Sequence, residues 1–345
     1  MTCPTCGTEV ISNELFSKKS PKCTKQGCYD FASKKTCRKC NTELPSDIMD
    51  YKKYLRFSIL GTTGSGKSNF LTTMLHELRN SINSPWVISP MNNLTSTIFQ
   101  DNDRALYEMR QPVEANIPGA SPPPLLWRIK DRGRMTRNDI PSYSMTIFDG
   151  AGEDCENIDP VISRYIGGSK VLVIVIDPLS LPGIAKNISP DVLSWSIKVS
   201  HSEGASANMV DGLTNYIRES CQISPGRLIN RDVAVVFTKI DAVKDSFGSA
   251  ATVMRPSPHL AANGFDKKDA DHVNVEIKDW LARNGETAFL NAIETNFRKE
   301  RVRFFGVSSF GQPPIGADRL GQIMPHRVLD PLIWMLSKEK IASII

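Results

Sequence analysis

Long apolar runs are missing from the sequence, which argues against a membrane-spanning helix. In 345 residues the longest apolar run covers residues 171–176, far short of the roughly 20 residues that cross a bilayer. The first residues also lack the basic and then apolar layout of a secretory signal. We therefore expect a soluble protein that works in the cytoplasm, without a membrane partner.

Signatures of a metal-dependent or serine-type hydrolase are missing as well. The five histidines do not form the H-x3-H or H-E-x-x-H spacings that bind a catalytic metal, and no Ser/His/Asp arrangement can be read. Hydrophobic residues make up 40% and charged residues 23% of the chain, which is ordinary globular usage and excludes wholesale disorder. The length suits one large domain with an added module.

The excess positive charge of the chain is confined to its N-terminal sixth. Residues 1–56 hold 11 Lys and Arg against 6 Asp and Glu, whereas the remainder holds 31 of each sign. Six of the eight cysteines also lie within the first 40 residues. These shifts in composition predict a boundary near residue 50, with a small cysteine module over residues 1–50 and a large domain over residues 51–345.

The N-terminal cysteines form three closely spaced pairs: Cys3 with Cys6, Cys23 with Cys28, and Cys37 with Cys40. Such spacings let both thiolates of a pair reach one tetrahedral zinc ion, and we predict a zinc-ribbon-like module that binds Zn²⁺. A disulfide framework is the rival interpretation, but it needs an oxidising compartment that nothing in the sequence indicates. Six thiols do not divide evenly into four-thiolate sites, and no histidine lies in this segment. The pairs that share a zinc ion therefore stay open.

The basic module could also contact nucleic acid. Its lysines would suit phosphate groups: Lys18, Lys19, Lys22, Lys25, Lys34 and Lys35. Aromatic residues for base stacking are few before residue 50, namely Phe16, Tyr29 and Phe31. Because scattered lysines usually solvate a face, we favour a zinc-stapled docking module over a nucleic-acid-binding one.

The central motif joins a predicted strand to a predicted helix. Residues 55–60 alternate apolar positions as a strand does, and residues 69–78 place apolar side chains on one helical face. Between them lies the full G-x4-G-K-S pattern of a phosphate-binding loop. Backbone amides and the helix dipole of such a loop hold phosphates, its lysine reaches the β- and γ-phosphates, and its serine hydroxyl holds Mg²⁺. The predicted nucleotide contacts are Gly61, Thr62, Thr63, Gly64, Ser65, Gly66, Lys67, Ser68 and Asn69.

A second motif, D-x-x-G-E, follows another predicted strand and contains Asp149, Gly152 and Glu153. An aspartate at the end of a strand suits the Mg²⁺ shell, so Asp149 joins Ser68 as a predicted magnesium ligand. The amide of the glycine can meet the γ-phosphate. We predict that Lys67, Asp149, Gly152 and Glu153 form the catalytic set.

A third motif indicates the base. A predicted strand ends in Thr238, Lys239 and Asp241 of a T-K-x-D pattern. The Asp241 carboxylate can accept the N1 and N2 protons of guanine, a pair that adenine does not offer, and Lys239 would lie along the base plane. Another predicted strand leads to Ser308 and Ser309, whose backbone would support the guanine. In this order after a phosphate loop, the motifs predict a site for GTP and GDP.

The chain resembles a GTPase of the translation-factor-related (TRAFAC) class in four ordered segments: GTTGSGKS at 61–68, DGAGE at 149–153, TKID at 238–241 and VSS at 307–309. It resembles the bacterial double-GTPase family more narrowly in CRKCNTELP at 37–45, IDPL at 176–179, LPG at 181–183 and LDPLIWML at 329–336. This resemblance covers nearly the whole chain. It implies a zinc module followed by one GTPase domain, and a role in bacterial conflict or defence systems.

The sequence departs from the family pattern at two places that bear on catalysis. Residues 113–124, where a Mg²⁺-capping threonine is expected, hold no threonine, and Ser121 is the candidate substitute. Glu153 stands where many small GTPases carry a water-orienting glutamine, and its charge would repel the γ-phosphate. We expect slow hydrolysis, accelerated when a protein partner or self-association supplies a cation. Candidate cations within the chain are Arg164, Arg132, Arg134 and Arg137.

These observations predict a P-loop GTPase-like α/β domain of three layers over residues 51–345, with insertions at about residues 80–140 and 178–230. Its mostly parallel sheet should have about six strands, near residues 55–60, 125–129, 143–148, 171–176, 232–237 and 302–307. Helices are expected near residues 94–109, 208–222, 273–281, 286–297 and 326–337. The predicted function is a switch that binds GTP with Mg²⁺ and hydrolyses it slowly. A non-hydrolysing nucleotide sensor or scaffold and a nucleic-acid-binding effector stay as alternatives, and Asp241 argues against an ATPase.

Overall fold

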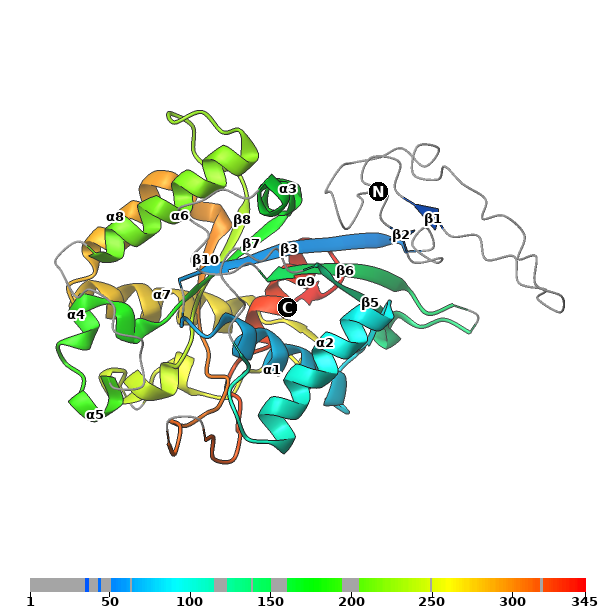
Figure 1. Ribbon diagram of the computed structural model, residues 1–345, viewed down its shortest axis with the longest axis horizontal. Coiled ribbons are helices and arrows are strands. Elements are labelled where there is room, and N and C mark those ends of the chain that lie inside the picture. The colour runs from blue at the N-terminus through cyan, green and yellow to red at the C-terminus, as the bar shows by residue number, and fades with distance from the viewer. Residues whose placement is uncertain are drawn as a thin grey trace, which may run out of the picture.

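The computed structural model describes residues 51–345 except 63, 115–122, 138, 150–159, 194–204, 249 and 317–318, and it also describes residues 35–36 and 43–44. Within residues 51–345 a central sheet lies between two layers of helices (Figure 1). The predicted three-layer α/β architecture is therefore confirmed. Among the described helices, none combines the length and the hydropathy needed to cross a bilayer.

In the described part of the chain the central sheet has seven strands. In sheet order they are β10 (Val302–Gly306), β8 (Asp232–Phe237), β7 (Val171–Ile176), β3 (Lys53–Gly61), β6 (Ser142–Asp149), β5 (Leu125–Asp131) and β4 (Trp86–Pro90). The first five run parallel to one another, and β5 and β4 are antiparallel to their neighbours. The sheet is therefore mostly parallel, as predicted.

The edge strand β4 is one more strand than the sequence predicts. It alternates buried Trp86 and Ile88 with exposed Val87, as a half-buried strand should. It is only five residues long and lies next to Pro85 and ends at Pro90. Proline weakens a strand prediction, but an edge strand tolerates it because one side of its backbone has no partner in the sheet.

Helices cover both faces of the sheet (Figure 1). One face carries α1 (Lys67–Asn80), α2 (Asn93–Asp103) and α9 (Asp330–Lys338), and the other carries α3 (Pro160–Gly168), α6 (Ala205–Cys221) and α8 (Thr287–Asn296). Helix α7 (Lys267–Arg283) packs against β10. Shorter elements are α4 (Pro182–Ala185), α5 (Pro190–Leu193), a π-helical turn at Arg104–Glu108, 3-10 turns at Arg132–Arg134, Pro178–Ser180, Ile240–Ser246, Thr252–Met254 and Lys299–Arg301, and the paired strands β9 (Gly264–Phe265) and β11 (Ser343–Ile344).

The two hydrophobic cores meet across the central strands. In β7, Val171, Val173 and Val175 pack into the core on the α1 side, while the residues between them pack into the core on the α6 side. All six residues of β7 are buried. A continuous apolar run is what a parallel strand with both faces covered requires, so the expected central position of this strand is confirmed.

The parallel strands bring several loops to one edge of the sheet. The carboxyl ends of β3, β6, β7, β8 and β10 lie at this edge, and the register pairs Ile59 with Asp149 and Gly61 with Val175. In open α/β sheets, ligands bind outside the carboxyl ends of the strands. The fold therefore gathers the predicted site residues of separate motifs at the same place.

The opposite edge of the sheet holds three of the arginines that were candidates for a catalytic cation. Arg132, Arg134 and Arg137 lie between β5 and the amino end of β6, whereas Asp149 ends β6. Seven strand steps separate these ends by about 23 Å, so these arginines lie far from the site of their own chain. That they supply the cation through self-association stays a prediction. Arg134 instead donates to Lys340 O at 3.0 Å, just after the C-terminal end of α9. Cations are favourable there because carbonyl groups point out of the helix.

In the N-terminal segment the structure describes one short strand pair. β1 (Lys35–Thr36) and β2 (Glu43–Leu44) pair antiparallel, with Lys35 opposite Leu44. In the sequence this pair flanks the last of the three cysteine pairs.

The predicted zinc ligands are not among the residues that the structure describes. All six lie outside the described ranges: Cys3, Cys6, Cys23, Cys28, Cys37 and Cys40. Zinc binding by Cys23 and Cys28, which have the wider C-x4-C spacing, therefore stays a prediction, as does zinc binding by the two C-x-x-C pairs. The same holds for the zinc-ribbon-like module as a whole and for its boundary near residue 50.

The last helix begins later than its apolar pattern predicts. The pattern predicts a helix from residue 326, but α9 begins at Asp330. His326 pairs with Ser308 in an antiparallel bridge, and Arg327 has a left-handed φ of 53°. Neither conformation continues a helix. Pairing with a distant segment therefore overrides the local apolar pattern here.

A buried ionic cluster joins the starts of α7 and α9. Arg327 donates to Asp330 at 2.7 Å and also to Asp269, and His259 lies 3.7 Å from Asp330. The His259 Nδ1 atom accepts the backbone N–H of Asp266 at 3.1 Å. His259, Asp269 and Asp330 place possible metal-ligand atoms within 4.8 Å of one another, and the Arg327 guanidinium already supplies the cation between the two carboxylates. We therefore interpret this group as an ion pair network.

The stability of the fold should depend on His259 at mildly acidic pH. Burial, reinforced by the Arg327 guanidinium, lowers the pKa of His259 despite the nearby Asp330 carboxylate. Below about pH 6.5 His259 is protonated in the unfolded chain but stays neutral in the native protein. The free energy of unfolding therefore falls by up to about 1.4 kcal/mol for each pH unit. His259→Asn keeps an oxygen that can accept the Asp266 N–H but does not titrate. Between about pH 7.5 and pH 5.5, denaturant titrations should show a smaller loss of stability in His259→Asn than in the wild type; equal losses would contradict this account.

Candidate functional site

The loop between β3 and α1 has the backbone of a phosphate-binding loop. Gly64 and Gly66 have left-handed φ values of 74° and 83°, which favour glycine. Gly66 precedes the first turn of α1, where no side chain caps the helix and no acidic residue lies. The first N–H groups and the positive end of the helix dipole thus stay available for an anion.

Gly61 is required by close packing between neighbouring strands. A Cβ atom at this position would lie 2.2 Å from Val175 O of β7, far inside any real contact distance. The glycine at the end of β3 therefore lets the phosphate loop leave the sheet beside β7.

Lys67 lies above this loop, held by its carbonyl groups. Its buried Nζ atom donates to Gly61 O at 3.0 Å and to Thr62 O at 2.9 Å. The ammonium group is thereby kept at the mouth of the loop. Positive charge at that place suits the β- and γ-phosphates that the sequence assigns to it.

Ser68 and Asp149, the predicted magnesium ligands, are brought into contact by the fold. The Ser68 hydroxyl donates to Asp149 Oδ2 at 3.0 Å, because β6 is paired with β3 in register. Mg²⁺ prefers oxygen ligands and typically takes one or two from the protein, with phosphates and water completing its shell. The two side chains therefore fit this ion. The other catalytic candidates, Gly152 and Glu153, lie outside the described residues, as do Thr63 and Ser121.

Thr238 and Lys239 link the end of β8 to the phosphate loop. The Thr238 hydroxyl donates to Ser65 O at 2.7 Å, and Lys239 Nζ donates to Gly64 O at 3.3 Å. Lys239 itself has a left-handed φ of 50°, a conformation that bulky residues adopt only when their surroundings enforce it. The predicted base-reading and phosphate loops are therefore connected by direct hydrogen bonds.

Asp241 is the second residue of the short helix Ile240–Ser246, which follows Lys239. Burial raises the pKa of its carboxyl group, and a hydrogen bond with the Ser308 side chain opposes this rise. Ser308 and Ser309 are both buried at the end of β10. The structure thus brings together the residues of the two predicted guanine motifs, although they are more than 60 positions apart in the chain.

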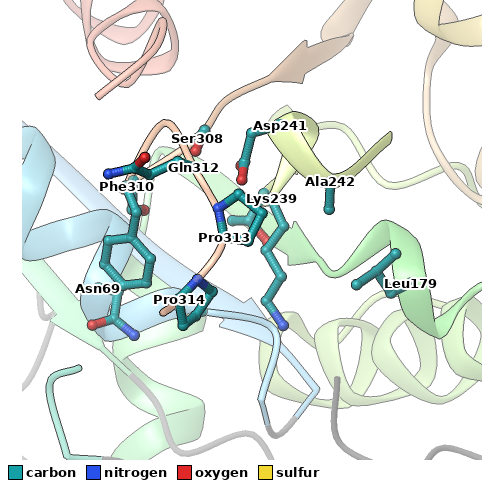
Figure 2. A pocket seen from close by; sticks show the side chains of 13 residues that line it. Asn69, Leu179, Lys239, Asp241, Ala242, Ser308, Phe310, Gln312, Pro313 and Pro314 are labelled. Carbon is teal, nitrogen blue, oxygen red and sulfur yellow. The ribbon is translucent and has the colours of Figure 1, made fainter. Parts of the chain in front are cut away.

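These residues line an open pocket at the carboxyl ends of the strands (Figure 2). The predicted residues in its lining are Gly66, Asn69, Thr238, Lys239, Asp241, Ser308 and Ser309. Sequence reasoning did not assign Leu179, Ala242, Phe310, Gln312, Pro313 and Pro314, which also line it. Figure 2 shows Asp241 and Lys239 beside the pocket, with Phe310 and Pro314 on the other side from Leu179 and Ala242.

Asp177, a further site residue without an assignment from the sequence, supports Lys239. Its buried carboxylate accepts Lys239 Nζ at 2.6 Å and the backbone N–H of Leu179 at 2.9 Å. One side chain therefore holds two parts of the pocket lining. Its place directly after the central strand β7, at the edge where the motifs gather, was the signal that could have identified it.

Adding a methyl group at Gly61 should damage both the fold and phosphate binding. In Gly61→Ala the new Cβ atom meets Val175 O, and overpacking of this kind costs about 1–3 kcal/mol of unfolding free energy. The matched control is Gly212→Ala in α6, where a Cβ atom would meet nothing within 4 Å and the helix should gain up to about 1 kcal/mol. Denaturant titrations measure both variants; an unchanged midpoint for Gly61→Ala would contradict the close approach.

Comparison with known proteins gives limited matches. No curated protein matches the sequence. The family model described as the central domain of helicase HerA matches residues 49–90. This stretch contains β3, the phosphate loop, α1 and β4 and ends before the residues that line the base side of the pocket. The match is therefore to the phosphate-loop part of a P-loop NTPase.

Solved structures with some likeness are GTPase domains. The GTPase-like domain of S. cerevisiae Ski7 bound to GTP is 13% identical, with 87% of this chain and 53% of that chain covered and a TM-score of 0.34. The same domain bound to GDP and inorganic phosphate is also 13% identical, with 86% of this chain and 52% of that chain covered and a TM-score of 0.34. The SRb-GTP/SRX complex of the signal recognition particle receptor from Chaetomium thermophilum is 12% identical, with 75% of this chain and 93% of that chain covered and a TM-score of 0.33. The chain spans about half the length of the Ski7 chains, and likenesses this weak carry no conclusion about its activity.

Proposed function

We propose that the chain is a guanine-nucleotide-binding protein that holds GTP or GDP with Mg²⁺ in the pocket described above. The observation that carries this proposal is the position of Asp241. Its carboxylate lies in the pocket wall with Ser308 and Ser309, and Lys239 of the same loop donates to the phosphate loop. Phosphate-binding and guanine-reading groups thus belong to one continuous site.

Asp241 supplies the selectivity for the base. A carboxylate accepts hydrogen bonds and donates none, so it suits the N1–H and the N2 amino group of guanine. Adenine has no proton at N1 and no amino group at C2, so it would leave a partly buried carboxylate unpaired, which is costly. The aliphatic stem of Lys239 provides a surface for the plane of the base, as expected from the T-K-x-D pattern.

Hydrolysis of GTP at this site would be slow. Mg²⁺ held by Ser68 and Asp149 would neutralise charge on the β- and γ-phosphates, and Lys67 would add a second cation. Glu153 would have to orient the attacking water although its charge repels the γ-phosphate. Because the 132–137 arginines lie at the other edge of the sheet, the accelerating cation would come from a protein partner, from a second copy of the chain or from Arg164 in α3.

We further propose that nucleotide state controls binding of a protein partner, so the chain acts as a switch. A place in a bacterial conflict or defence system rests on the family resemblance of the sequence. The zinc module would serve as the docking part of this switch. The antiparallel pair β1–β2, which flanks Cys37 and Cys40 in the sequence, is consistent with a zinc knuckle that includes these two cysteines.

Replacing one carboxylate oxygen of Asp241 by an amide group should change which base the protein binds. Wild-type protein with Mg²⁺ should bind GDP and not ADP in calorimetric titrations. Asp241→Asn should lose GDP affinity by about 100-fold or more, since hydrogen bonds to a charged acceptor are lost. The same variant should gain affinity for XDP, because xanthine has a carbonyl group at C2 that accepts from the asparagine amide.

Asp245→Asn is the matched control for this experiment. Asp245 lies in the same short helix, is exposed and carries the same charge, so its substitution should leave GDP binding unchanged.

GDP binding should also depend on pH. Burial raises the pKa of Asp241, and as the pH falls through this pKa the carboxylate takes up a proton and no longer accepts both guanine N–H groups. On acidification, the GDP affinity of the wild type should therefore begin to fall at a higher pH than it would if Asp241 had the pKa of an exposed aspartate. Equal binding of GDP and ADP, or binding of ADP alone, would contradict guanine recognition.

The zinc proposal has its own test in the metal content of the purified full-length chain. Under reducing conditions mass spectrometry should find at least about one zinc per chain, since four thiolates hold one ion. Cys6→Ser should lower this content. Cys221→Ser is the control, because burial raises the pKa of this thiol in the large domain and disfavours the thiolate that zinc requires. A wild-type protein free of zinc would rule the module out as a zinc site.

A further inference from the structure

Residues 308–316 and 319–326 form the two arms of a hairpin between β10 and α9, which we call the 308–326 hairpin. Its arms are joined by Ser308 N to His326 O at 3.0 Å, His326 N to Ser308 O at 2.8 Å and Met324 N to Phe310 O at 2.9 Å. Nearer the tip, the Gln312 side-chain amide donates to Gln322 O at 2.7 Å. The paired arms therefore extend well beyond the two serines of the predicted guanine motif.

The root of the hairpin is fixed to the core. His326 Nε2 lies 2.7 Å from Val253 O, and the guanidinium of Arg327 donates to Thr252 O and Arg255 O. The same guanidinium joins the buried ionic cluster. Because the root is held on several sides, the hairpin can move only by swinging about this root.

One arm of the hairpin forms a wall of the base pocket. Phe310, Gln312, Pro313 and Pro314 all line the pocket (Figure 2). Consecutive prolines have a fixed φ and little freedom to rearrange. At Gly311 a Cβ atom would lie 1.9 Å from Met324 O of the other arm, so the two arms are packed at the closest approach. The wall is thus pre-formed and stiff.

The other arm reaches the segment that leads into residues 113–124, where the Mg²⁺-capping residue is expected. Leu320 is buried, and its backbone N–H donates to Arg110 O at 2.8 Å. Three residues further on, Val113 N donates to the side-chain oxygen of Asn69 at 2.8 Å. Asn69 follows the magnesium ligand Ser68 and also lines the base pocket. Residues 110–113 are therefore held from two sides, by the hairpin and by the first turn of α1.

We propose that the 308–326 hairpin is a positioning element that covers the base and ties it to the segment 110–113, with Leu320 as its key residue. The inference rests on the proposed guanine site. The same rigid hairpin contacts the base pocket on one arm and Arg110 on the other, so displacement at one contact displaces the other. Base release then requires the hairpin to move, and the γ-phosphate side senses the same movement through residues 110–113.

The test is the release of a fluorescent GDP, N-methylanthraniloyl-GDP, from full-length protein with Mg²⁺. Leu320→Ala shortens the buried side chain next to the backbone contact with Arg110. Release should accelerate by about tenfold, with little change in association, since interface changes act mainly on dissociation. The ratio of affinities for GDP and for the non-hydrolysable analogue GMPPNP should shift as well, to the disadvantage of GMPPNP. A merely structural role of Leu320 would not move this ratio.

Ile315→Ala is the matched control, because Ile315 is in the same hairpin but is 66% exposed near the tip. It should leave release within about twofold of the wild type. Gln312→Ala, which removes the side-chain hydrogen bond between the arms, is the second variant should Leu320→Ala fold poorly. Because Gln312 also lines the pocket, its GDP/GMPPNP ratio, which should shift in the same direction, is the readout for this variant. Unchanged release and an unchanged GDP/GMPPNP ratio in both variants would overturn the role of the hairpin while leaving the guanine site intact. Wild-type protein that binds no guanine nucleotide would overturn both proposals.

Discussion

The ion pair between Lys239 and Asp177 is the contact on which the arrangement of the pocket depends. Lys239 Nζ lies 2.6 Å from Asp177 Oδ2 and donates to Gly64 O. Three loops that leave β3, β7 and β8 are thereby held together by one ammonium group. Charge-assisted hydrogen bonds are shorter and stronger than neutral ones, so the spacing between the phosphate loop and the loop after β8 is set before any ligand arrives. In the proposed site a nucleotide would span these two loops and would have to match this spacing.

The parallel sheet decides where chemistry can occur in this domain. Strand register puts Ser68 beside Asp149 and Gly61 beside Val175, and the same register sends the 132–137 arginines to the far edge. Those arginines carry positive charge, as a hydrolytic site needs, yet Arg134 serves the region that follows the C-terminal end of α9. Charge alone is therefore a poor guide to catalysis, because the direction of a strand determines which end of it reaches the site.

The hairpin that follows β10 adds a wall to the pocket that the two loops alone would not form. Ser308 and Ser309 alone would support one side of a base, and Phe310, Pro313 and Pro314 add a stiff wall. Its root is anchored through Arg327 to Asp269 and Asp330, so the start of α9 and the start of α7 share the same buried charges. Pre-organised walls raise affinity by reducing what must be ordered on binding. The domain thus holds the proposed base pocket through contacts that lie well outside the predicted guanine motifs.

The sequence by itself determined the local features of this protein. The phosphate loop could be read because glycine and lysine at fixed spacing impose one backbone course, and β7 could be read because only a doubly covered strand is apolar throughout. The structure brings most of the described residues of the predicted site together, since each motif lies at the end of a strand and parallel strands end at one edge. The tertiary structure alone decided the rest: β4 despite its prolines, the late start of α9, the support of Lys239 by Asp177 and the second wall of the pocket. These features depend on contacts between segments that are distant in the chain, such as Ser308 with His326 and Leu320 with Arg110, and no local pattern of residues encodes such a contact.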